Sequence, residues 1–401
     1  MLLIFLTVLT VCYDNMDSSM DISMNMTNNW QDEFQLDKGL LYLNHAAVSP
    51  WPRCAQKAVK DFTDENSIYG SRNYLQWLET EQALREQLAR LINAPSSSDI
   101  ALLKNTSEAL SVVAHGLDWQ SGDNIVSSNE EFPSNRIVWQ SLASQGVELR
   151  QADLSTNESP EDALFALVDE QTRMIAISSV EYASGLKLDL QRIGEFCQQH
   201  EILFCVDAIQ SIGALRFDVQ TCHIDFAMAD GHKWMLGPEG LALFYVRAEQ
   251  RDALQLHQYG WHMTEDYMNF DNRQWTVAES ARRFECGSPN MLAIHALQAS
   301  TALLLDIGME EIERRVIDNS SYLIDLISEN KDLGCITNTH PERLAGIVTF
   351  KHRAKDSQGL YTELMQAGIM CAYRGGGIRF SPHFYTNRET LSKAIDAVIK
   401  Q

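Results

Sequence analysis

The segment ILFCVDAIQSIG, residues 202–213, joins an apolar run to an acid, Asp207. A short apolar run bounded by polar residues is typical of a buried strand. An acid directly after such a strand lies at the edge of the sheet, where open α/β sheets bind their ligands. The same residue type is also common in turns and caps. The segment therefore predicts one strand of an α/β sheet, with a candidate binding site at its carboxyl end.

Similar runs stand on both sides of this segment and alternate with amphipathic stretches. Strands are expected over residues 124–127, 174–180, 202–206, 226–228 and 241–246, and helices over residues 80–92 and 107–117. This alternation favours a mostly parallel mixed sheet flanked by helices, in a large domain that we expect over residues 55–290.

The pattern becomes more helical after about residue 290. Helices are expected over residues 292–307 and 309–330, a strand over residues 345–350 and a last helix after Thr386. Thr386 and Glu389 have the spacing of a capping box at the start of that helix. A smaller α+β C-terminal domain is therefore expected over residues 291–401.

Composition excludes several classes of partner. The chain has 401 residues, of which 45% are hydrophobic, and a formal net charge of -22. This charge opposes binding to nucleic acid and to anionic membranes, so neither is expected as a partner. The eight cysteines are scattered without zinc spacing, which favours a reduced, cytoplasmic protein without a metal site.

The N-terminus carries a short apolar run over residues 2–12. The run fits the core of a signal peptide or an anchor, but no basic residue precedes it and it is too short to span a bilayer. The polar stretch that follows is typical of disorder. Residues 1–29 are therefore expected to form a disordered or dispensable extension.

Three polar groups follow expected strands. They are Asp207, then Lys233 in DGHKWMLGPEG (residues 230–240), and then Thr106 and Ser107 in KNTSEAL (residues 104–110) at a helix start. A buried amine, an acid for a ring nitrogen and a helix N-terminus for a phosphate are what pyridoxal 5'-phosphate requires. Each group alone has a plainer explanation, because most lysines are solvated charges.

Five segments together resemble the class V aminotransferase family, which has the fold type I of aspartate aminotransferase and includes cysteine desulfurases, kynureninase and isopenicillin-N epimerase-like enzymes. The segments are YLNHAAVSP, VDAIQSIG, DGHKWMLGPEG, FECGSPN and RGGGIRFSPHFY, in this order from about Leu41 to the C-terminus. The resemblance implies a homodimeric enzyme that uses pyridoxal 5'-phosphate on an amino-acid substrate.

The resemblance also implies roles for single residues. Lys233 would form the Schiff base with the cofactor and then move the proton at Cα of the substrate. Asp207 would pair with the pyridine nitrogen and Gln210 would reach the ring hydroxyl. The remaining cofactor-binding residues would be Thr106, Ser107 and His232 at the phosphate, Phe132 against the ring, and Ser288 at the phosphate of the partner subunit. Phe132 has a plainer alternative as a core residue.

Substrate binding is implied for three residues. Arg379 would hold the substrate carboxylate through paired hydrogen bonds. Arg374 either assists it or is a loop charge, and glycines 375–377 between them are expected to form a turn. Residues 30–54 resemble a segment that lies over the active site. Within that segment, His45 is either a substrate contact or a capping or surface histidine.

The sequence departs from the family at three places. Asp230 stands where many relatives have a serine beside the phosphate, and its charge would repel a phosphate. Glu181 stands where relatives often have asparagine near the ring. The short segment RGGGIR (residues 374–379) has no room for the cysteine loop of desulfurases, and Cys371 before it is expected to be a buried thiol.

Three functions remain open at this point. The leading hypothesis is a transaminase, in which the amino group of the substrate stays on the cofactor. The second is a β-lyase or desulfurase-like enzyme without a catalytic cysteine, a kynureninase-like hydrolase or an epimerase. The third is a homologue that binds the cofactor without turnover. One cofactor supports all of these reactions, so the fold does not decide between them.

Overall fold

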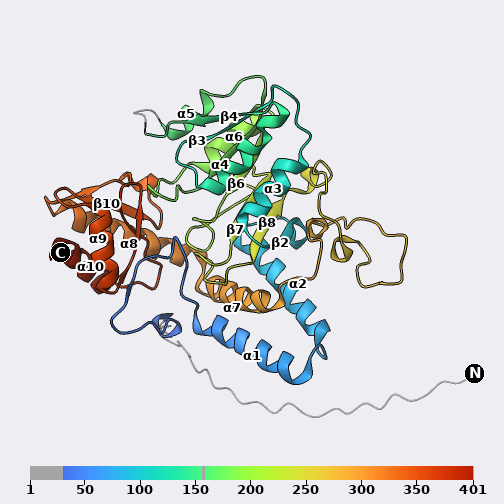
Figure 1. Ribbon diagram of the computed structural model, residues 1–401, viewed down its shortest axis with the longest axis horizontal. Coiled ribbons are helices and arrows are strands. Elements are labelled where there is room, and N and C mark those ends of the chain that lie inside the picture. Colours follow the sequence, from blue (N-terminus) through green and yellow to red (C-terminus); the bar gives the residue numbers. More distant parts are fainter. Residues whose placement is uncertain (1–29, 156–158, 401) are drawn as a thin grey trace, which may run out of the picture.

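The protein is described here from a computed structural model that covers residues 30–155 and 159–400 (Figure 1). The expected extension over residues 1–29 lies outside the described residues. The centre is a seven-stranded sheet in the order β2-β8-β7-β6-β5-β3-β4. Only β8 runs antiparallel to its neighbours, which confirms the predicted mixed, mostly parallel α/β sheet. The strands are β2 (Ile100–Leu103), β3 (Asn124–Ser128), β4 (Glu148–Ala152), β5 (Thr172–Ser178), β6 (Leu203–Asp207), β7 (Phe226–Asp230) and β8 (Ala242–Val246).

Helices cover both faces of this sheet (Figure 1). Successive side chains of a strand point to opposite faces, so Phe204 and Val206 join one apolar cluster while Cys205 joins the other. Both faces are therefore buried, as a parallel sheet requires. The helices before the second sheet are α1 (Arg53–Tyr69), α2 (Tyr74–Leu91), α3 (Thr106–Gly116), α4 (Pro133–Gln140), α5 (Pro160–Phe165), α6 (Leu190–Gln199) and α7 (Met291–Ile307).

A second, four-stranded antiparallel sheet follows in the order β12-β13-β10-β9 and has its own apolar cluster. Its strands are β9 (Leu333–Cys335), β10 (Val348–His352), β12 (Ala372–Arg374) and β13 (Gly377–Phe380). Its helices are α8 (Met309–Ser328), α9 (Ser357–Gln366) and α10 (Arg388–Lys400). Short 3-10 helices lie at Trp30–Glu33, Ser97–Asp99, Ser141–Gln145, Ala248–Gln250, Trp261–Met263 (η5), Ala281–Phe284 (η6) and Pro341–Arg343.

Helix α7 begins at Met291, where the sequence predicts the start of the C-terminal domain. It packs along α1 and α2, below the large sheet in Figure 1. The chain turns toward the second sheet only after Gly308, which has a φ of 88°. Among the described residues no single helix has the length and hydropathy of a membrane span, and α7 and α8 meet that test only as a pair bent by 85°.

The start of α10 differs from the prediction. The helix begins at Arg388, and the side chain of Asn387 accepts the amide hydrogen of Thr390 at 2.8 Å. The hydroxyl of Thr386 instead accepts the amide hydrogen of His383 at 3.1 Å, within the preceding turn. The predicted capping box at Thr386 is therefore wrong, because this hydroxyl is already used and asparagine is an equally good cap one residue later.

The N-terminal segment of residues 41–49, called here the strap, connects both sheets. Its strand β1 (Leu41–Tyr42) pairs in parallel with β11 (Ile369–Met370) beside the second sheet. Its other end is bonded to the large sheet, because Ser49 donates its amide hydrogen to the carbonyl of His232 at 2.8 Å. Gln210 also donates to the carbonyl of Ala46 at 3.1 Å. The strap thus lies against the residues that follow β6 and β7.

Candidate active site

Lys233 lies three residues beyond the end of β7 and its amine is buried. Burial disfavours the charged ammonium and lowers the pKa of Lys233 to about 8, with Asp207 opposing and Arg379 adding to this shift. The Nζ atom lies 5.8 Å from the centre of the Phe132 ring. A lysine with these properties is half neutral near pH 8, so it can act as a nucleophile and as a base.

Asp207 is the last residue of β6 and its side chain is buried. One carboxylate oxygen accepts the amide hydrogen of Ile209 at 3.0 Å. Burial raises the pKa of Asp207 to about 6, and the nearby Lys233 opposes that rise. Within the described residues Asp207 forms no ion pair. A positive group bound beside it would therefore stabilise its buried carboxylate.

The N-terminus of α3 lies near Asp230 and His232. Asp230 accepts the amide hydrogen of Thr106 at 2.6 Å, and Ser107 donates its hydroxyl hydrogen to Ser134 at 2.8 Å. Nδ1 of His232 is buried, lacks a hydrogen-bond partner among the described residues, and lies 3.5 Å from Asp230. Burial and Lys233 lower the pKa of His232 to about 4, so its ring is neutral at pH 7.

Phe132 and Gln210 are the two residues that were predicted, with Asp207, to contact the cofactor ring. Phe132 is 41% exposed, so it is not a core residue, and its ring meets Tyr182 edge-on at 5.2 Å. Gln210 is buried, and its Oε1 accepts a hydrogen bond from Trp234 at 2.9 Å. Its Nε2 has one hydrogen left after the bond to the strap. Phe132 therefore lies beside Lys233, and Gln210 lies between the strap and Trp234, while their contacts with a cofactor ring stay predictions.

Arg379 enters the site from β13 of the second sheet. Its Nη1 donates to the carbonyl of Tyr182 at 2.6 Å, while its Nε is buried without a partner among the described residues. Burial and the nearby Arg374 lower the pKa of Arg379 to about 10. Arg374 itself is exposed and donates to its neighbour's carbonyl. Gly375 and Gly376 have positive φ and form the predicted turn between β12 and β13.

We expect Arg379→Lys to weaken carboxylate binding by about 10- to 100-fold, because an ammonium cannot form the paired hydrogen bonds of a guanidinium. The effect should fall on KM and kcat/KM for the amino-acid substrate, measured by steady-state kinetics. Arg374→Lys is the matched control and should change kcat/KM by less than about threefold, because this side chain is exposed. Equal losses in both variants would contradict the assignment.

Two predicted residues have other surroundings. The ring of His45 is fully buried, with Nδ1 2.8 Å from the carbonyl of Ser381 and Nε2 2.6 Å from the hydroxyl of Tyr385. Both ring nitrogens have partners within the chain, so His45 fastens the strap, and its contact with substrate stays a prediction. Ser288 is exposed in a cavity of about 430 Å³ that Lys104 and Glu108 also line. Its contact with a partner subunit stays a prediction.

The acid pair Glu131 and Glu181 lies at the ends of β3 and β5, and Glu131 was missed from the sequence. Glu131 accepts three short hydrogen bonds, from the amide and hydroxyl of Ser178 and from Asn135, and a longer one from Ser128 at 3.4 Å. Glu181 accepts one from Ser128 at 2.7 Å, and its Oε2 is buried without a described partner. Burial raises both pKa values, that of Glu131 to about 7. Three donors favour the charged form of Glu131, so the neutral acid is Glu181.

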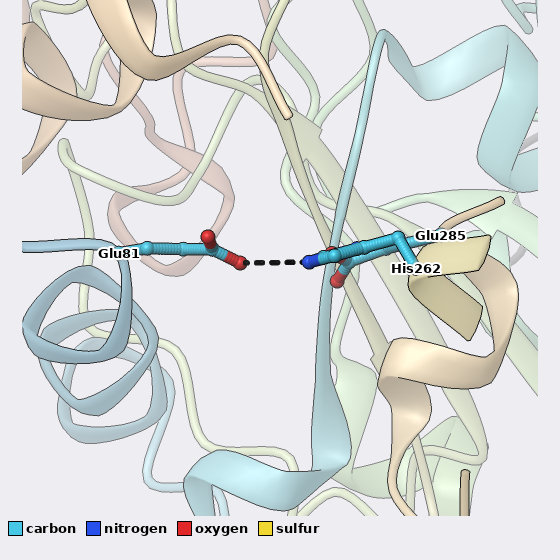
Figure 2. Close-up of side chains that lie close together, drawn as sticks. All are labelled: Glu81, His262 and Glu285. Atoms are coloured by element: carbon cyan, nitrogen blue, oxygen red, sulfur yellow. Dashed lines mark ion pairs between the residues drawn. The ribbon is translucent and has the colours of Figure 1, made fainter. Parts of the chain in front are cut away.

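A second buried cluster lies away from Lys233 and consists of Glu81, Arg85, His262 and Glu285. Figure 2 shows His262 and Glu81 pointing toward each other, with Glu285 beside the ring. Two carboxylates and an imidazole are possible metal ligands. However, Arg85 bonds Glu285 at 2.5 and 2.7 Å and also bonds Glu81. It thereby neutralises the oxygens that face His262. The cluster therefore ties α2 to η5 and to the residue after η6.

Three comparisons relate this site to known proteins. The family model "Aminotransferase class-V" matches residues 41–390. A probable cysteine desulfurase of Methanothermobacter thermautotrophicus is 29% identical over 377 residues, which cover 88% of this chain and 92% of the relative. The uncharacterized aminotransferase YcbU of Bacillus subtilis is 28% identical over 344 residues, covering 85% of this chain and 89% of the relative.

Solved structures show the same fold. Cystine C–S lyase C-DES, solved with its product cysteine persulfide, has a TM-score of 0.83 and 22% identity, covering 90% of this chain and 97% of that chain. A lysine-to-alanine mutant of C-DES holds glycine covalently linked to its PLP cofactor. The family model covers most of the chain and includes every predicted site residue. The chain therefore belongs to the class V aminotransferase family and has its fold type I architecture.

Proposed function

We propose that the protein is a pyridoxal-phosphate-dependent enzyme that cleaves a carbon–sulfur bond at Cβ of an amino acid without an enzyme thiol. The cofactor is supported by three groups around one space: the Lys233 amine, the buried Asp207 carboxylate without an ion pair, and the buried Nδ1 of His232, which has no hydrogen-bond partner among the described residues. Each group fits one part of the cofactor, respectively its aldehyde, its protonated ring nitrogen and its phosphate.

The residues of this chain would divide the work. When bound, the cofactor supplies an electron sink for the bond that breaks at Cα. Arg379 holds the substrate carboxylate, and its position beside Tyr182 fixes Cα near Lys233. The Lys233 amine takes the proton from Cα. The sulfur at Cβ leaves with the electron pair of the C–S bond and takes up the proton that Lys233 removed from Cα. Water then releases pyruvate and ammonia.

The thiols of the chain support sulfur release without an enzyme persulfide. Within the described residues, Cys371 is the cysteine nearest in sequence to the arginine hairpin of residues 374–379. It is 1% exposed, and burial raises its pKa to about 12. A thiolate attack on sulfur needs an exposed thiol with an ordinary or lowered pKa. Relatives named cysteine desulfurase and the C–S lyase C-DES support sulfur-containing substrates.

Transamination is the second candidate, and the relative named as an aminotransferase favours it. In that reaction Lys233 would pass on the proton that it takes from Cα, the cofactor would supply the acceptor for the amino group, and a keto acid would be released. The two candidates share every residue named above and differ only in products. A cofactor-binding homologue without turnover is the remaining alternative. The homodimer and the cytoplasmic location stay predictions.

The purified protein should be incubated with cofactor and L-cysteine, L-cystine or other amino acids, with quantification of pyruvate, ammonia and released sulfur. We expect pyruvate and sulfur in equal amounts from a sulfur amino acid, and unchanged rates in Cys371→Ser and Cys286→Ser. A keto acid that retains the side chain of its donor would favour transamination. Loss of sulfur release in either cysteine variant would contradict a thiol-free lyase.

A further inference from the structure

The N-terminus of α3 is already occupied by a negative group of this chain. Asp230 ends β7, and its Oδ1 accepts hydrogen bonds from the amide of Thr106 at 2.6 Å and from the Thr106 hydroxyl at 3.3 Å. The cap residue Asn105 accepts the amide hydrogen of Glu108 at 2.8 Å. Of the first three amides of α3, these bonds leave that of Ser107 for a ligand. A phosphate at this helix start would therefore lie beside the Asp230 carboxylate.

The charges around Asp230 do not compensate it together with a phosphate. From α3 it is faced by the uncharged Thr106. From the segment after β7 it is faced by His232, which is neutral at pH 7, and by Lys233, whose charge is partly lost near pH 8. Glu239, before β8, and Asp207, at the end of β6, add further negative charge. Among the described residues no lysine or arginine forms an ion pair with Asp230.

We propose that Asp230 shares the start of α3 with the cofactor phosphate, and that cofactor binding takes up one proton on this carboxyl group. The proposal rests on the proposed cofactor but not on the reaction catalysed. In the free protein the carboxylate satisfies the Thr106 amide, which keeps the helix start in shape. In the complex the protonated carboxyl keeps that bond through one oxygen and donates a hydrogen bond to the phosphate through the other.

The pKa of Asp230 supports the uptake of a proton when the cofactor binds. Burial raises the pKa of Asp230 to about 6, partly offset by the Thr106 bonds, so the group is already close to accepting a proton. A phosphate dianion at hydrogen-bond distance would raise it further, because two adjacent anions repel each other in a site shielded from water. Since the complex then holds one more proton than the free protein, affinity must rise as pH falls.

Pyridoxamine phosphate is the suitable probe, because it carries the same phosphate and forms no Schiff base with Lys233. Its dissociation constant should be measured between pH 7 and pH 9, where the phosphate ester stays a dianion. We expect the dissociation constant of the wild type to rise with pH more steeply than that of Asp230→Asn. The difference should be up to about tenfold per pH unit. Calorimetry of the wild type in buffers with different ionisation enthalpies should show uptake of about one proton at pH 7.5.

The matched control is Glu239→Gln, which removes a nearby acid that is not among the cofactor-binding residues and should keep the pH slope of the wild type. Asp230→Ser provides a second neutral variant in case the asparagine variant folds poorly. Equal slopes in wild type and both Asp230 variants, or no proton uptake, would overturn the role of Asp230 while leaving the cofactor intact. Failure of the wild type to bind pyridoxamine phosphate at any pH would instead remove the proposed cofactor.

Discussion

Lys233→Ala is expected to lower turnover by at least about 100-fold, and this is the largest functional effect predicted from the site. Proton transfer by a positioned side chain contributes about 10²- to 10⁴-fold on its own, and the variant also loses the amine that would bind the cofactor covalently. Turnover should be measured with the sulfur amino acid that gives the highest wild-type rate. Borohydride should fix the cofactor to wild-type Lys233 and leave the variant unlabelled.

Lys57→Ala is the matched control for this prediction. Lys57 is an exposed residue of α1 paired with Asp61, so its loss should change neither turnover nor labelling. The rate of covalent cofactor capture in the wild type should rise from pH 6.5, reach about half of its maximum near pH 8 and level off only above that, as the Lys233 amine loses its proton. Identical labelling of wild type and Lys233→Ala would remove Lys233 from the mechanism.

Arg85→Met is expected to destabilise the fold by about 3–5 kcal/mol, because it leaves the buried carboxylates of Glu81 and Glu285 without their cation. His262 lies 3.5 Å from Glu285 and can recover only part of the loss by taking up a proton, since burial lowers its pKa. The thermal midpoint should fall by several degrees in a melting experiment. The loss should be larger at a pH where His262 is neutral, because the ring then cannot compensate the two carboxylates.

The control for the stability prediction is Arg314→Met on α8. Arg314 also bonds two carboxylates, those of Glu311 and Asp318, but its side chain is 55% exposed. Solvent screens such pairs, so the expected cost is within about 1 kcal/mol. A similar shift of the melting midpoint in both variants would show that burial of the Glu81 and Glu285 cluster adds nothing.

Part of the site could be predicted from the sequence, by the rule that ligands of α/β sheets bind at the carboxyl ends of the strands. Asp207 and Lys233 follow apolar runs, and parallel strands bring such positions to one edge of the sheet, so their proximity follows from local sequence. The same rule applies to Glu131 just after β3 and could have found it. Arg379 needed the resemblance, because it reaches the site from a strand of the other sheet.

Other features depend on partners that local sequence does not reveal. The role of His45 is decided by Ser381 and Tyr385, more than 300 positions later. The acids Glu81 and Glu285 have ordinary helix and loop surroundings in sequence, and only the fold buries them around Arg85. The domain boundary before α7 stays a prediction, because the apolar pattern of α7 is that of any buried helix and its packing on α1 and α2 leaves no local signal.

The strap has a consequence for synthesis on the ribosome. Its strand β1 pairs with β11, and His45 bonds a residue 336 positions further along the chain. The large sheet is complete once β8 has emerged, whereas residues 41–49 must wait for nearly the whole polypeptide. Pairing over such a separation forms late because of its loop-closure cost. Closure of the strap is therefore a post-translational event, and a chain truncated before residue 369 would leave the residues around Lys233 uncovered for chaperones and proteases.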